Sequence, residues 1–297
     1  MTSLVQTIEL LKAGNVVALP TETVYGLAGN ALNSAAIAKI FATKRRPQDN
    51  PLIVHVSGID MVRNLKLHIP PLAERLAERF WAGALTMVLR READCPLPHE
   101  VSCGLDTAAV RVPDNAIFLE VIKKTMFPLA APSANLSGSP SPTTAQHVRD
   151  DFGEEFPVVD GGACRVGIES TVVMFDDNDA IRILRPGAVT SEMLREYGNV
   201  VTDEGGSRHS PGTRYKHYAP RAKVIAVQAD AEAFTERTKH ERFVIANPET
   251  STLFMFLRQY DQLNADKIFV RLPERSGVGA ALYNRIIRAA EFEVTQW

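Results

Sequence analysis

Cations, hydroxyls and amides gather at the ends of the strands predicted in the first 200 residues. Open α/β sheets bind ligands at strand ends, where loops supply the polar groups. Arginine and lysine suit phosphate or carboxylate, and hydroxyls and amides suit phosphoryl and ribose oxygens. We therefore expect a site for an anionic, oxygen-rich ligand, built from the cations Lys44, Arg45, Arg46, Arg111 and Arg185 and the polar residues Thr23, Thr107, Ser133, Asn135, Ser141 and Ser170.

Taken singly, most of these residues have an ordinary structural interpretation. The basic run at 44–46 is typical of a solvated helix end. His55 follows apolar strand residues and is typical of a satisfied core histidine. Arg111 is different because it stands between two valines, where a cation is costly unless it is paired or binds a ligand. The coincidence of several polar clusters, more than any one residue, indicates a site.

The chain lacks the short motifs of several large enzyme classes. There is no GxxxxGK[ST] phosphate loop, no HExxH and no GxSxG, and the GVG at 277–279 lacks the third glycine of a dinucleotide fingerprint. The three cysteines form no CxxC pair, which argues against a disulfide scaffold and a structural zinc site. Cys103 and Cys164 have no neighbouring histidine, so we interpret them as packing residues. We predict no metal site held by the protein.

Composition places the chain among ordinary globular proteins. Of its 297 residues, 45% are hydrophobic and 23% charged, and the length suggests two domains. Lys+Arg 33 against Asp+Glu 35 gives a net charge of −2, so no global basic field attracts nucleic acid. The N-terminus lacks the pattern of a targeting signal, and no apolar run has the length of a membrane span. We expect a cytoplasmic protein without membrane contact and with weak or no direct nucleic-acid binding.

Helices and strands mix over the first 200 residues, which predicts one α/β domain around a twisted sheet. Ser3 and Asn33 are expected helix caps. The expected strands lie at 16–19, 52–56, 85–89, 108–112, 128–131, 158–159, 171–175 and 181–184.

Glycine and proline mark residues 201–221 as a linker or lid. Strands at 223–227, 243–246 and 267–270 then alternate with helices at 231–238, 252–260 and 278–290. This strict alternation predicts a small parallel sheet covered by helices over residues 222–297.

Several ordered motifs resemble one family. PTETVYGL at 20–27, KxRP and NPL at 44–52, SAN at 133–135, GxEST at 167–171 and RPG at 185–187 resemble the threonylcarbamoyl-AMP synthases of the YrdC-domain superfamily. SPGTRYKHYAP at 210–220 is similar to the linker of their long, two-domain form. The resemblance implies a YrdC-like catalytic domain with a twisted open mixed sheet over 1–200, a linker or lid over 201–221, and a small Rossmann-like domain over 222–297.

The resemblance also implies an activity: condensation of L-threonine, bicarbonate and ATP into L-threonylcarbamoyl-AMP and pyrophosphate, for threonylcarbamoylation of adenosine at tRNA position 37. It implies Mg²⁺ with the triphosphate, and the tRNA threonylcarbamoyl transferase complex as a candidate partner. Lys44 and Arg46 would be catalytic. Threonine would contact Thr23, His55, Arg111, Ala131 and Ser170. ATP would contact Arg46, Asn50, Thr107, Ser133, Ser141, Arg185 and Tyr215, with Asn135 and Tyr218 in second rank.

Two alternatives remain open at this point. The cationic site could belong to a module that binds double-stranded RNA or tRNA without turnover, although the near-neutral charge opposes strong binding. The chain could also be a carbamoyltransferase-type relative, although the zinc-finger and acylphosphatase segments expected there are missing. One departure from the family pattern is WAGALT at 81–86, which has alanines where the family usually has prolines.

Overall fold

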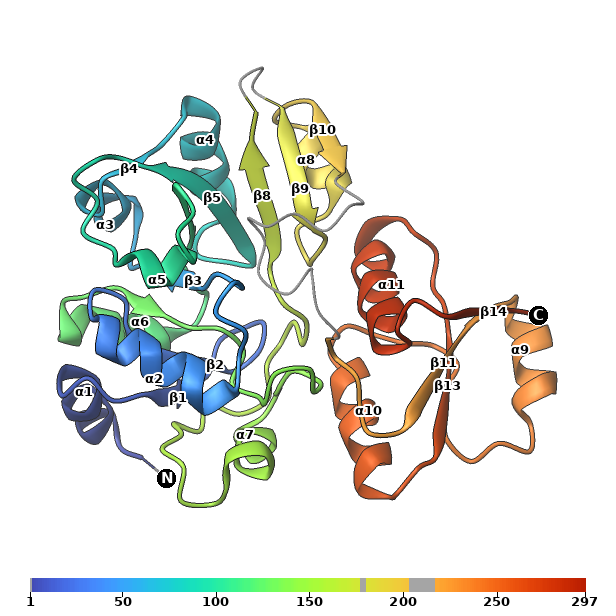
Figure 1. Cartoon of the computed structure of the whole chain (residues 1–297). Coiled ribbons are helices and arrows are strands. Elements are labelled where there is room, and N and C mark those ends of the chain that lie inside the picture. Colours follow the sequence, from blue (N-terminus) through green and yellow to red (C-terminus); the bar gives the residue numbers. More distant parts are fainter. Residues whose placement is uncertain (1, 177–179, 203–216) are drawn as a thin grey trace.

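The computed structural model describes residues 2–176, 180–202 and 217–297, which form two α/β units (Figure 1). The first unit contains the strands β1 (Val17–Leu19), β2 (Gly26–Asn30), β3 (Ile53–His55), β4 (Leu67–His68), β5 (Leu85–Arg91), β6 (Thr107–Arg111), β7 (Leu129–Ala130), β8 (Thr171–Phe175), β9 (Ile181–Arg185) and β10 (Val200–Thr202). Its helices are α1 (Leu4–Lys12), α2 (Ser34–Lys44), α3 (Ile59–Asn64), α4 (Pro71–Phe80), α5 (His99–Ser102), α6 (Ala116–Thr125), α7 (Ala145–Phe152) and α8 (Ser191–Arg195).

The strands of this unit form one sheet in the order β1-β2-β7-β3-β6-β5-β8-β9-β10, with β4 paired to β5. The pairs β3–β6, β5–β8 and β9–β10 are parallel and the others are antiparallel. The predicted mixed sheet is therefore confirmed. The strand expected at 158–159 is wrong: only an isolated bridge joins Val158 to Ala18. Pro157 has no N–H with which to extend the pairing, and Gly162 shortly afterwards has a positive φ of 78°.

Local sequence explains where α2 begins and why it ends at the basic run 44–46. The side chain of Asn33 caps the helix by accepting from the N–H groups of Ala35 and Ala36, as expected. The helix ends where Arg45 adopts a left-handed conformation (φ 51°), which turns the chain back toward β3. Ser3 caps α1 in the same way and forms a capping box with Gln6.

Strand register places two predicted site residues side by side. The parallel strands β3 and β6 pair so that His55 lies opposite Arg111, at the last residue of each strand. Side chains paired in this way on one face of a sheet lie close together. Helices hold the sheet on both sides: α2 and α4 contribute to the largest apolar core, and α1 and α6 form a second one around Leu11 and Phe118.

The second unit follows the predicted alternation. It runs β11 (Lys223–Gln228), α9 (Ala231–Thr238), β12 (Val244–Ile245), α10 (Leu253–Gln262), β13 (Lys267–Arg271), α11 (Gly277–Ala289) and β14 (Val294–Gln296). The strands form a parallel sheet in the order β12-β13-β11-β14, so only β14 was not expected from the sequence. Figure 1 shows α10 and α11 on the side that faces the first unit.

Apolar contacts join the two units. Val24 and Ile168 of the first unit belong to the apolar core of the second, together with Tyr218, Phe254 and Ile286. In the described part of the chain, no helix has the length and apolar character needed to cross a bilayer.

Candidate active site

One pocket collects most of the predicted site residues. It has a cavity volume of about 60 Å³ and lies where β2, β3, β6 and the loop after β7 meet the start of the second unit. The residues that line it are Thr21, Thr23, Val24, Gly26, Arg46, Pro51, Ile53, His55, Arg111, Ala131, Pro132, Ser133, Glu169, Ser170, Arg185, His217 and Tyr218. All five residues expected at threonine are among them, as are three of those expected at ATP.

Three buried arginines converge on this pocket from distant parts of the chain. Arg46 follows α2, Arg111 ends β6 and Arg185 ends β9. Burial lowers the pKa of Arg46 to about 10, and repulsion from Arg185 adds to the effect. Burial also lowers the pKa of Arg185, while Arg285 and Arg111 repel its charge. A bound anion would relieve this repulsion, so the arrangement favours an anionic ligand.

Three groups fix the guanidinium of Arg111. One Nη lies 2.6 Å from a carboxylate oxygen of Glu22, the other donates to Thr23 Oγ1 at 2.9 Å, and Nε donates to the Gly83 carbonyl at 3.0 Å. Thr23 Oγ1 is in turn 2.8 Å from Thr21 Oγ1. The desolvation cost of placing Arg111 between apolar strand residues is therefore offset, because this arginine is both paired and hydrogen-bonded.

His55 is a neutral group at physiological pH. Burial and the neighbouring charge of Arg111 lower the pKa of its imidazole to about 3. Its ring lies 5.0 Å from that of Phe118, and its Nδ1 makes no hydrogen bond to any described residue. The pocket therefore has a polar but uncharged group beside Arg111.

Arg185 and Ser170 form another part of the pocket lining. Arg185 donates to the Ser170 carbonyl through Nε at 3.2 Å and Nη2 at 3.0 Å. The Ser170 hydroxyl lies 2.8 Å from Thr86 Oγ1. This wall thus holds a guanidinium and a hydroxyl in a set geometry.

The remaining residues expected at ATP lie around the pocket at different depths. Arg46 donates to the carbonyls of Asn50 and Pro51 at 3.0 and 2.9 Å, and Asn50 lines a neighbouring cavity with Arg45 and His217. Thr107 begins β6, whereas Arg111 ends it, so Thr107 lies toward the other end of that strand. Tyr215 falls outside the described residues.

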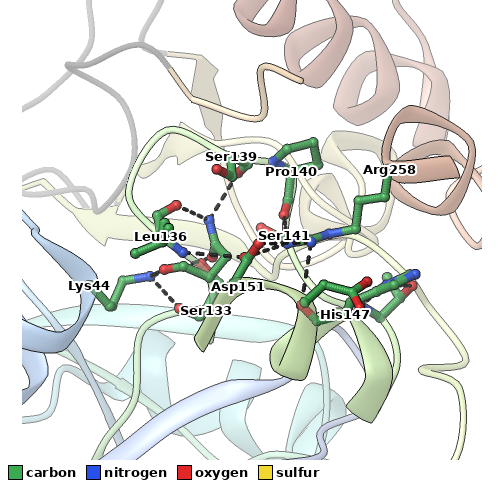
Figure 2. A network of polar contacts seen from close by, with 12 residues as sticks. Lys44, Ser133, Leu136, Ser139, Pro140, Ser141, His147, Asp151 and Arg258 are labelled. Carbon is green, nitrogen blue, oxygen red and sulfur yellow. Dashed lines mark hydrogen bonds and ion pairs between the residues drawn. The ribbon is translucent and has the colours of Figure 1, made fainter. Parts of the chain in front are cut away.

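Lys44 and Asn135 hold a loop and are not among the residues that line the pocket. Figure 2 shows Lys44 beside Ser133. The buried ammonium of Lys44 donates to the carbonyl of Ser133 and, at 2.7 Å, to that of Asn135. Burial and repulsion from Arg46 lower the pKa of Lys44 well below its usual value. The Asn135 amide donates to the carbonyls of Leu136 and Ser139 at 2.8 and 2.9 Å. In this structure Lys44 thus holds the backbone of the loop at 133–135, and its catalytic role stays a prediction.

Tyr218 reaches the pocket from the start of the second unit. It has a positive φ of 65°, and its ring stacks on Phe254 with centroids 5.3 Å apart. The guanidinium of Arg285 lies 5.4 Å from the same ring. Its neighbour His217 also lines the pocket, and burial lowers the pKa of that imidazole to about 3.

Sequence reasoning missed two carboxylates of the site, Glu22 and Glu169. Both lie within the quoted motifs, which was the available signal, but their partners are distant in sequence. Glu22 pairs with Arg111, and Glu169 accepts from Ser141 and from Arg285 Nε at 2.9 Å. Since arginines already engage both, the carboxylates do not form a metal cage. Among the described residues, no cluster of three or more histidine, cysteine or acidic side chains is placed to hold a metal ion.

Comparisons with known proteins show the family of the chain. Residues 9–187 match the Sua5/YciO/YrdC family model, described as telomere recombination, and residues 189–291 match the model of the threonylcarbamoyl-AMP synthase C-terminal domain. The chain is 38% identical to the threonylcarbamoyl-AMP synthase of Bacillus subtilis, over 96% of this chain and 92% of that protein. It is 37% identical to that of Pyrococcus abyssi, over 96% and 93%.

The fold agrees over the same span. The crystal structure of P. abyssi Sua5 complexed with L-threonine superposes with a TM-score of 0.87 at 34% identity, covering 99% of this chain and 96% of that one. The matches therefore include both units and the pocket between them. The chain belongs to the threonylcarbamoyl-AMP synthase family.

Proposed function

We propose that this protein condenses L-threonine, bicarbonate and ATP into L-threonylcarbamoyl-AMP and releases pyrophosphate. The observation that carries the proposal is the convergence of Arg46, Arg111 and Arg185 on one pocket that also holds His55 and Ser170. Such a pocket can bind a carboxylate and a polyphosphate side by side. The structure of the P. abyssi relative with L-threonine supports the choice of amino acid.

The reaction needs no nucleophile from the protein. The threonine amine adds to bicarbonate and forms a carbamate with loss of water. A carbamate oxygen then attacks the α-phosphorus of ATP, and the bond to the pyrophosphate oxygen breaks. Catalysis can therefore come from alignment and from cations placed where charge develops. Two of the three cysteines agree with this, because desolvation raises the pKa of the half-buried Cys103 to about 11 and that of the buried Cys164 to about 12.

We assign the threonine end of the pocket to Thr23, His55, Arg111, Ala131 and Ser170. Arg111 is the partner for the threonine carboxylate, because a planar guanidinium can hold both oxygens. The neutral His55, whose buried Nδ1 has no hydrogen-bond partner among the described residues, is suited to the threonine hydroxyl. A site that hydrogen-bonds this hydroxyl discriminates strongly against analogues without it, whereas the methyl group contributes only ~1–3 kcal/mol.

We assign the nucleotide end to Arg46, Ser133, Ser141 and Arg185, with Tyr218 beside them, within a catalytic domain over 1–200. Residues 201–221 join it to the domain over 222–297. Mg²⁺ is expected to arrive with the triphosphate as part of the substrate, and no step is assigned to it. The product is a reactive mixed anhydride, so a transferase that modifies tRNA must consume it, and we expect both in the cytoplasm.

Pyrophosphate release from ATP tests this function. Threonine and bicarbonate are supplied singly and together, and we expect release only when both are present. Release that ignores threonine would rule the proposal out. Affinity for RNA without any turnover would replace it with the binding-module alternative.

Arg111 provides a sharper test of the site. Arg111→Ala should raise the KM for threonine at least tenfold, since hydrogen bonds to charged groups contribute about 1.5–3 kcal/mol, and leave the KM for ATP within threefold. Arg165→Ala is the matched control, because Arg165 is exposed and its ion-pair partner among the described residues is Asp114 at the surface. An equal loss of ATP affinity in Arg111→Ala would show that this arginine serves the nucleotide instead.

A further inference from the structure

A buried arginine of the second unit contacts Glu169, which lines the pocket. Arg285 lies in α11, and its side chain is fully buried. Nε donates to a Glu169 carboxylate oxygen at 2.9 Å, and Nη1 donates to the Pro186 carbonyl at 2.8 Å. The other Glu169 oxygen accepts from the Ser141 hydroxyl. One carboxylate therefore connects Arg285 to a residue of the nucleotide end.

The carboxylate of Glu169 is held in its ionised form. Burial alone would raise its pKa, but the charges of Arg285 and Arg185 outweigh burial and lower it. An ionised carboxylate only accepts hydrogen bonds. It therefore orients the Ser141 hydroxyl proton toward itself, which leaves the lone pairs of the hydroxyl oxygen to accept from another donor. Ser141 itself is buried behind Glu169, which lines the pocket.

A second arginine of the same unit reaches the residue before Ser141 (Figure 2). Arg258 of α10 donates through Nη2 to the Pro140 carbonyl at 2.6 Å and to Asp151 at 2.7 Å. Asp151 also accepts from the backbone N–H of Leu136 at 3.3 Å. The loop that carries Ser141 is thus tied to α10 by its backbone, independently of the contact through Glu169.

The backbones of the two units pack closely against each other at Gly167. Gly167 has a φ of +79°, and a Cβ there would lie 2.4 Å from the Thr250 carbonyl oxygen and 2.6 Å from the Ser251 Cα. Only glycine allows the backbones of the two units to meet at this distance. This contact lies two residues before Glu169, in the loop that shapes the pocket.

From these contacts we propose that the second unit is a structural part of the nucleotide end, with Arg285 as a positioning residue that acts on Ser141 through Glu169. The inference rests on the proposed function, in which Ser141 contacts ATP. Breaking a buried ion pair leaves an uncompensated charge, whereas a pair kept intact holds its neighbours in one arrangement. The pair would therefore control the affinity for nucleotide as well as stability.

A double-mutant cycle tests the coupling. Arg285→Met should raise the KM for ATP about tenfold in the presence of Ser141, but less than threefold in a Ser141→Ala background, because residues that act through one network are not additive. Arg285→Lys, which keeps a cation for Glu169, should recover most of the affinity. Arg221→Met is the control, since Arg221 is an exposed arginine of the same unit that pairs with Asp261.

The outcomes separate this inference from the proposed function. If Arg285→Met raised the KM for ATP equally with Ser141 and with Ser141→Ala, or left it at the wild-type value, the proposed coupling would be overturned. If Arg285→Met fails to fold, the same cycle with Arg285→Lys decides, with a smaller expected ratio of about threefold. If the wild type shows no threonine-dependent turnover, the function fails, and calorimetry with a non-hydrolysable ATP analogue still measures the coupling.

Discussion

Acidification should destabilise the first unit through His55. The pKa of this imidazole is about 3 in the folded protein and about 6.5 in the unfolded chain. Because the folded pKa is depressed, the unfolded chain binds the proton first as the pH falls below 6.5. The stability is therefore fully present above pH 6.5 and is lost between pH 6.5 and 3.

The size of the effect follows from these two values. Between pH 7 and pH 5 the difference in proton binding lowers the free energy of unfolding by about 2 kcal/mol. This is a large share of the ~5–15 kcal/mol that stabilises a typical domain. Other groups add their own pH dependence, so the prediction concerns the difference between the wild type and His55→Gln, which cannot titrate at that position.

Tryptophan fluorescence during urea unfolding provides the assay. The chain has two tryptophans, so a Trp297→Phe background leaves Trp81 as the reporter of the first unit. Its indole donates to the Leu85 carbonyl at 2.8 Å and should respond when that region unfolds. Unfolding curves at pH 7, 6 and 5 should converge for the two proteins as the pH falls. Parallel curves, with the difference unchanged from pH 7 to pH 5, would refute the assignment of a neutral buried imidazole.

Two further substitutions test the loops around the pocket. Lys44→Met removes the donor for the Ser133 and Asn135 carbonyls and should cost about 1–3 kcal/mol of unfolding free energy, with a raised KM for ATP; a lower kcat at unchanged stability would instead support a catalytic lysine. Gly187→Ala would place a Cβ 2.3 Å from the Thr171 N and 2.6 Å from the Ser170 carbonyl carbon. We expect a loss of about 1–3 kcal/mol from overpacking and weaker threonine binding, measured by thermal unfolding and by the threonine KM; a wild-type melting temperature would contradict this reading.

Local sequence determined most of the secondary structure, because helix periodicity, caps and strand alternation depend on near neighbours. Asn33 caps α2 as expected, and the alternating pattern of the second unit was predicted almost completely. The short strand β14 was missed because its residues are exposed and carry no clear apolar pattern. Sequence also identified Arg111, since a cation between two valines needs a partner wherever the strand lies.

Only the tertiary structure decided which polar residues share the pocket. Lys44 and Arg46 are neighbours in the sequence, yet Arg46 lines the pocket and Lys44 holds the loop at 133–135, because α2 ends between them. Glu169 and Arg285 are separated by 116 positions, and packing of α11 brings them together. Ion pairing and burial depend on contacts between distant segments, so no local pattern reveals them. The sequence therefore indicated most of the residues that line the pocket, and the packing of the two units determined what each of them contacts.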